Sequence, residues 1–104
     1  MAYLSRRPPG MPRIHPVVEQ VLRLLRQRTD DEGSERVGVQ EIAVLMGRDP
    51  LYRRSLFHVL RRLVARGLVE WHESVEGSSV GWYQISEEGR TMLDTIDNIR
   101  RLYP

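Results

Sequence analysis

Apolar residues recur at helical spacing in four segments of the chain. In 15–28 they follow an i, i+3, i+4, i+7 pattern, which marks one face of a helix: Val18, Val21, Leu22 and Leu25. The other three segments are 40–46, 50–66 and 87–102. The pattern therefore predicts four helices, with a polar loop over 29–36 between the first and the second.

The ends of these segments carry residues that favour helix boundaries. Gly47 and Gly67 follow the second and third helices, where a left-handed backbone conformation commonly ends a helix. Asp49 and Pro50 are expected to begin the third helix, because Asp accepts first-turn amides and Pro loses no needed donor there. Ser86 is expected to cap the last helix in the same way.

Strand-like segments separate the third helix from the last. The segments 68–74 and 80–85 are rich in apolar and aromatic residues, and the polar run 76–79 between them is expected to turn the chain, which predicts a β-hairpin. A short strand is also possible at 37–39. The order helix, strand, helix, helix, hairpin, helix predicts an α+β, mostly α, fold. Its class is the winged helix-turn-helix, with a three-helix core, a hairpin wing and an extra C-terminal helix.

This order divides the chain of 104 residues into three parts. Residues 1–13 contain three prolines, one glycine and three arginines, and are interpreted as a flexible basic arm. Residues 14–86 form the winged helix-turn-helix domain. Residues 87–104 form the C-terminal helix, interpreted as a dimerisation element.

Composition argues against several other classes of protein. The chain has no cysteine, and its three histidines lack metal-ligand spacing, so no metal or cofactor is expected. No apolar run approaches the length of a membrane span, and the start does not resemble a signal peptide. With neither a span nor a signal peptide, the protein is expected to be cytoplasmic and nucleoid-associated. No nucleophile with a base can be assembled, so we expect no enzyme.

Positive charge is concentrated in two places. Residues 1–16 hold three arginines and no acid, and residues 48–66 hold six arginines and one acid. All 16 basic residues are arginine, which suits phosphate and guanine, although codon usage in a GC-rich genome gives the same bias. The uneven distribution favours a surface that binds a polyanion.

The segments 40–46 and 50–66 form the helix-turn-helix, whose second helix enters the major groove. Its polar side provides the candidate base-reading residues Arg53, Arg54, His58 and Arg61. An ordinary solvated face would intersperse acids among its arginines, whereas 53–66 holds five arginines and none. Phe57 lies between the two faces; we expect it to extend the core, with contact to thymine methyl groups as the alternative.

Candidate contacts to the DNA backbone come from three regions: Arg48 and Arg62 of the motif, Ser78 and Ser79 of the wing, and Arg6, Arg7 and Arg13 of the arm. The hairpin also carries Glu70, Glu73 and Glu76, which DNA should repel. Wing contact would therefore depend on backbone amides at its tip. The arm could enter a minor groove, or make no contact at all.

Two stretches resemble winged-helix transcriptional regulators, most closely the PadR-like and MarR-like families. They are SLFHVLRRLVARGLVEW at 55–71 and GWYQISEEGRTML at 81–93. The matching residues are Phe57, Leu60, Leu63, Gly67 and Leu68, then Tyr83, Ile85, Ser86 and Gly89. The resemblance covers about residues 15–103. It implies a homodimeric repressor or activator that binds palindromic operators; no effector pocket is marked.

The apolar stripe of the last helix has two interpretations. Its 4-3-4 spacing suits a two-helix seam, which would place these residues in a dimer interface: Met92, Ile96, Ile99 and Tyr103. Alternatively, the stripe packs on the first helix of the same chain. We favour the dimer, because three helices and a hairpin already close most of a winged-helix core.

Together these features predict a DNA-binding transcriptional regulator that reads the major groove with helix 50–66. The alternatives are a winged-helix module that docks on proteins of a larger complex, favoured by the acidic wing, and a binder of structured RNA.

Overall fold

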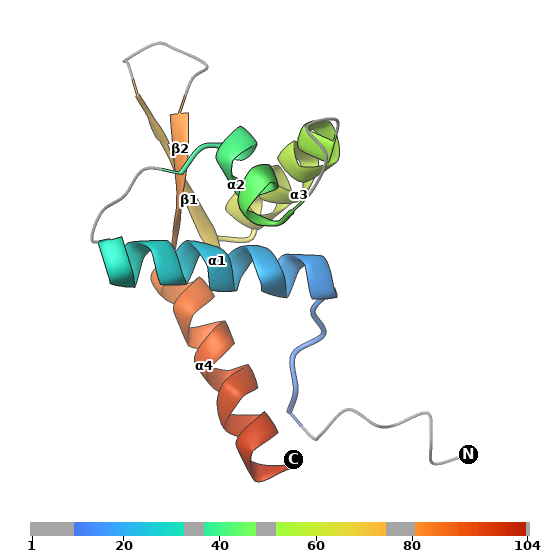
Figure 1. Cartoon of the computed structure of the whole chain (residues 1–104). Coiled ribbons are helices and arrows are strands. Elements are labelled where there is room, and N and C mark those ends of the chain that lie inside the picture. The colour runs from blue at the N-terminus through green and yellow to red at the C-terminus, as the bar shows by residue number, and fades with distance from the viewer. Residues whose placement is uncertain (1–9, 33–36, 48–51, 75–80, 104) are drawn as a thin grey trace.

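The computed structural model describes residues 10–32, 37–47, 52–74 and 81–103 (Figure 1). Within these ranges the elements are α1 Pro16–Glu32, α2 Val39–Leu45, α3 Arg53–Ala65, β1 Val69–Glu73, β2 Gly81–Ile85 and α4 Glu87–Leu102. The predicted α+β fold, mostly helical with a hairpin wing, is confirmed. In Figure 1, α1 crosses the molecule, with α2, α3 and the hairpin on one side and α4 extending from the other.

The core forms where the predicted helical stripes meet. Its fully buried side chains include Leu22 and Leu25 of α1, Leu60 of α3, Ile42 of α2 and Leu93 of α4. Burying a side chain of this size stabilises the fold by about 1.5–3 kcal/mol. The stripe residues therefore fix how α1, α2 and α3 pack, and with them the direction in which α3 faces solvent.

Two predicted boundaries differ in the structure. The loop expected over 29–36 begins too early, because α1 continues to Glu32. Acids near a helix C-terminus cost only about 0.3–1 kcal/mol each, so they do not by themselves end a helix. The third helix begins at Arg53 as an α-helix, with Tyr52 at its N-cap. The predicted start at Asp49 and Pro50 lies outside the described residues.

Glycine ends both helices of the motif, as predicted. Gly47 follows α2 with φ +69°, and Gly67 follows α3 with φ +78°. These are left-handed conformations, in which a side chain with a Cβ is strained. The residue that precedes α2, Gly38, has an extended backbone and caps the helix without a side chain.

The hairpin is antiparallel, with Val69 opposite Ile85 and Trp71 opposite Tyr83. Val37 joins it through a single bridge to Tyr83, whose amide donates to the Val37 carbonyl at 2.8 Å. The short strand considered at 37–39 is therefore one bridged residue, because α2 already begins at Val39. The predicted turn at 76–79 lies outside the described residues.

Ser86 joins α4 to the end of α3. Its hydroxyl accepts from the Gly89 amide at 3.0 Å, which confirms the predicted cap, and donates to the Gly67 carbonyl at 2.5 Å. The Ser86 amide donates to the Leu68 carbonyl at 3.1 Å. A Cβ on Gly89 would clash with that same carbonyl oxygen. The sequence Ser86-x-x-Gly89 thus lets the first turn of α4 rest directly on the chain that leaves α3.

Ion pairs hold α4 against α1. Arg23 donates to Asp97 at 2.7 Å and to Glu19 at 2.9 Å, and Arg100 donates to both Glu19 oxygens at 2.8 and 2.9 Å. Arg26 adds a weaker contact to Asp94. We call these six residues the α1–α4 charge network. Hydrogen bonds from Arg100 lower the pKa of Glu19, and those from Arg23 lower the pKa of Asp97.

Candidate nucleic-acid interface

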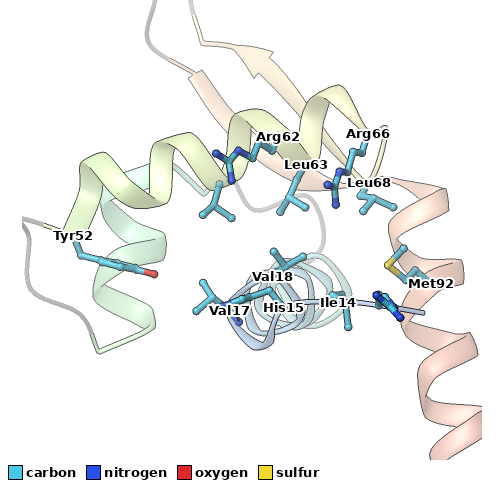
Figure 2. Close-up of a pocket in the computed structure, with 12 residues that line it drawn as sticks. Ile14, His15, Val17, Val18, Tyr52, Arg62, Leu63, Arg66, Leu68 and Met92 are labelled. Atoms are coloured by element: carbon cyan, nitrogen blue, oxygen red, sulfur yellow. Dashed lines mark hydrogen bonds between the residues drawn. The ribbon is translucent and has the colours of Figure 1, made fainter. Parts of the chain in front are cut away.

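The helix α3 has one buried side and two flanks that differ. Leu56, Leu60 and Leu63 are buried against the rest of the domain. On the first flank, Arg62 and Arg66 point toward α1 (Figure 2). The opposite flank is open and carries Phe57 and Val64, which are 40% and 36% exposed. Between the flanks lies the solvent-facing side of the helix.

Three of the predicted base-reading residues lie on that solvent-facing side. At about 100° per residue, Arg54, His58 and Arg61 fall within about 60° of one another, opposite the buried leucines. Arg53, the fourth, lies toward the open flank. All four side chains are exposed. We call these four residues together with Phe57 and Val64 the outward face of α3.

Phe57 does not extend the core, so that expectation is wrong. It is 40% exposed and is absent from the residues that pack in or against the core. Its neighbours are polar: the Arg61 guanidinium carbon lies 5.8 Å from the centre of its ring, and the His58 ring meets it edge-on at 5.9 Å. The reason is geometric: at about 100° per residue, Phe57 is turned about 90° from the centre of the three buried leucines, toward the open flank.

The arginines of α3 lack acidic partners. Among the described residues, none of the five arginines from Arg53 to Arg66 forms an ion pair with a carboxylate. The carboxylates of the α1–α4 charge network are occupied by their own arginines. The outward face therefore presents concentrated positive charge to solvent, which suits an anionic partner.

A cavity of about 350 Å³ separates α3 from the start of α1 (Figure 2). Its walls combine apolar residues, including Val18, Leu63 and Met92, with three arginines: Arg13, Arg62 and Arg66. Two of these, Arg13 and Arg62, were predicted to contact the DNA backbone. The structure brings them together with Arg66, which sequence reasoning did not single out. The sequence did indicate this position, because Arg66 lies four residues after Arg62 and therefore on the same side of the helix.

The other predicted backbone contacts cannot be placed, because Arg6, Arg7, Arg48, Ser78 and Ser79 lie outside the described residues. The end of the predicted arm is described, and Gly10 lies beside Ile99 of α4. Met11 and Pro12 are half-buried.

The described part of the wing is acidic. Glu70 and Glu73 are exposed on β1. His72 stacks on Trp82 of the opposite strand at 4.3 Å, and its Nε2 atom lies 3.3 Å from a Glu70 oxygen. No arginine belongs to β1 or β2. The strands of the wing therefore carry negative charge, whereas α3 carries positive charge.

The four residues predicted for a dimer seam differ in exposure. Ile96 is fully buried within this chain, and Met92 and Ile99 are half-buried. Tyr103 is 55% exposed, and its neighbour Leu102 is 75% exposed. The first half of the stripe thus serves the chain's own packing, while apolar surface remains open at the end of α4.

Two further features concern other kinds of site. None of the described helices is long and apolar enough to span a membrane. In the same described segments, no three His, Cys, Asp or Glu side chains are grouped as a metal site would require.

Solved structures of other proteins share this fold. No protein-family model and no curated protein matches the sequence. Among solved structures, a mutant of MepR from S. aureus has a TM-score of 0.68 at 14% identity, over 86% of this chain and 61% of its own. The zinc-responsive MarR-family member ZitR of Lactococcus lactis has a TM-score of 0.62 at 12% identity, over 93% and 60%. The fold is that of the MarR-like winged-helix regulators.

A third solved structure is closer in size. A candidate DNA-binding protein from Ralstonia eutropha is 26% identical, with a TM-score of 0.57, over 88% of this chain and all of its own. By contrast, this chain spans about 60% of the length of MepR and ZitR. The shared part therefore includes the winged helix, and the longer proteins contain additional chain.

Proposed function

We propose that this protein is a DNA-binding transcriptional regulator and that α3 enters the major groove. The observation that carries the proposal is the outward face of α3, whose arginines are exposed and have no carboxylate partner among the described residues. The winged-helix fold supports it, because the second helix of such a motif is the one that enters the groove.

Within this proposal the exposed residues have separate roles. Arg54 and Arg61 face solvent and are suited to guanine, which accepts two hydrogen bonds from one guanidinium. Arg53 and His58 contact the flanking bases. Arg13 and Arg62, which line the cavity between α3 and the start of α1, contact phosphates at the edge of the groove, where they fix position rather than sequence. Arg6, Arg7, Arg48, Ser78 and Ser79 are proposed as further phosphate contacts.

A homodimer would present two copies of α3 to the DNA. The apolar surface left open at the end of α4, Leu102 and Tyr103 with the half-buried Ile99, provides the proposed contact between copies. Two-fold symmetry then places the recognition helices about one DNA turn apart, roughly 34 Å, and predicts an inverted-repeat operator.

The test is selection from a pool of random duplex DNA at low and at physiological salt, followed by sequencing of the retained molecules. Enrichment of an inverted repeat supports a dimeric operator-binding regulator. Retention without enrichment that disappears as salt rises indicates a non-specific binder. Absence of retention at both salt concentrations contradicts the proposal. The Arg54→Ala/Arg61→Ala protein, selected in parallel, is the control for binding through α3.

The second candidate function is docking on other proteins, and the acidic strands of the wing favour it. Glu70 and Glu73 would be repelled by DNA but suit a basic protein surface. Absence of DNA selection, together with a stable complex that Glu70→Gln/Glu73→Gln disrupts, would support this candidate over DNA binding.

A further inference from the structure

Phe57 stands out on the outward face of α3 because it is the only phenylalanine of the chain and it is not used by the core. A phenylalanine that serves stability is normally buried, since its ring contributes much apolar area. Here the ring is 40% exposed and lies under the Arg61 guanidinium. Val64, two turns further along, is exposed on the same flank.

The surroundings of this ring restrict what could cover it. Arg53, Arg54 and Arg61 flank it, and none of these has a carboxylate partner among the described residues. A second copy of the same arginine-rich face would be repelled, and a neutral apolar partner would leave the guanidinium groups without counter-charges. The charge around Phe57 therefore favours a polyanion that also offers a small apolar group.

Duplex DNA meets both conditions at one base. In the major groove the bases expose hydrogen-bonding edges, and the apolar group among them is the C5 methyl of thymine, which aromatic side chains can contact. The arginines beside Phe57 would pair with the surrounding anionic and guanine groups. An exposed ring among arginines on a groove-facing helix thus has a matching target in DNA.

We propose that Phe57 contacts a thymine methyl group in each half of the operator, and that this contact is a determinant of sequence preference. The interaction of Arg61 with the ring holds both side chains on one side of the helix, so Arg61 is placed to contact a guanine next to that thymine. This inference rests on the proposed function, because it requires α3 to enter the major groove.

The experiment replaces single thymines by deoxyuridine in the best selected duplex, which removes the C5 methyl and preserves base pairing. Affinity is measured by fluorescence anisotropy for each substituted duplex. We expect one thymine in each half-site at which uracil weakens binding about fourfold, the effect of losing the burial of one methyl-sized group. The other thymines should tolerate uracil.

Variants of the protein identify the side chain responsible. Phe57→Ala should bind the thymine and uracil duplexes equally at the sensitive position. Because the ring is exposed and outside the core, its removal should leave the thermal unfolding midpoint nearly unchanged. Ser55→Ala, an exposed substitution on the same helix but on a different side, should preserve the preference for thymine.

The possible failures are distinguishable. If the protein selects a DNA sequence but no thymine is sensitive to uracil, or if Phe57→Ala retains the sensitivity, the Phe57 contact is wrong and the proposed function stands. If no duplex is retained at all, the proposed function and this inference are both overturned.

Discussion

Arginine has opposite surroundings in two regions of this molecule. In the α1–α4 charge network, Arg23, Arg26 and Arg100 each contact a carboxylate of the facing helix. On α3, the arginines are exposed, and the described residues provide no carboxylate for them. The first set connects two helices of one chain. The second set has positive charge available for another molecule, which is the basis of the proposed function.

The largest effect is expected when the unpaired arginines are removed. Arg54→Ala/Arg61→Ala should weaken binding to the selected operator about a hundredfold or more, because each well-aligned contact to guanine is worth about 1–3 kcal/mol. Thermal stability should change little, since both side chains are exposed. Anisotropy titrations and thermal melts measure the two quantities. Arg66→Ala, on the flank that faces α1, is the matched control and should reduce affinity much less.

Removing one arginine of the α1–α4 charge network should instead lower stability and leave DNA affinity unchanged. Arg23→Ala eliminates the hydrogen bonds to Asp97 and Glu19 and should lower the free energy of unfolding by about 1–2 kcal/mol, as expected for hydrogen bonds to charged groups that are partly exposed to solvent. Urea denaturation measures this loss. DNA affinity at low temperature, where the protein remains folded, should stay within error. A large loss of affinity there would show that the two regions are not functionally separate.

Two arginines of α3 should differ in the kind of effect as well as in its size. Arg54→Ala should reduce discrimination between operator and unrelated DNA, whereas Arg62→Ala should weaken binding to all sequences by a similar, smaller factor. Competition titrations against both duplexes measure the ratio. If Arg54→Ala leaves that ratio unchanged, its assignment to base reading is incorrect.

Acid should destabilise the fold through the α1–α4 charge network. Arg100 and Arg23 lower the pKa values of Glu19 and Asp97 in the folded state below their ordinary values of 4.5 and 3.8. Depressed carboxyl pKa values mean that the stabilisation is complete above pH about 4.5 and is lost as pH falls through the folded-state values. Thermal melts from pH 7 to pH 3 measure it. Glu19→Gln should show a smaller decrease over that range; an identical decrease would exclude Glu19 as a contributor.

The smallest effect concerns salt and stability. Operator affinity should fall with salt, with a slope of about 0.9 in log–log form for each phosphate contacted. The unfolding midpoint should decrease only slightly over the same range, because the ion pairs that Arg23 forms with Glu19 and Asp97 are 2.9 and 2.7 Å long and partly shielded from solvent. If added salt lowered the free energy of unfolding more than the free energy of DNA binding, the distinction between paired and unpaired arginines would be contradicted.

Much of the fold could be predicted from the sequence because the deciding interactions are local. Stripes at helical spacing located the four helices. Gly47 and Gly67 marked two ends through their own backbone conformations, and Ser86 capped α4 through an amide three residues away. The helix-turn-helix and its arginine-rich second helix followed from the same patterns. The continuation of α1 to Glu32 was missed because that last turn carries no apolar pattern.

Only the tertiary structure decided which arginines are paired and which apolar side chains are buried. Arg23 and Arg100 find carboxylates 74 and 81 residues away, a pairing that no local pattern contains. The same holds for Ile96, which packing within the chain buries, and for Arg62 and Arg66, which the position of α1 turns toward a cavity. Phe57 is exposed because the buried side of α3 is fixed by its neighbours. The sequence by itself therefore determined the elements, since helix and turn formation depend on nearby residues. The packing of those elements determined which charges are neutralised and which remain open to a partner.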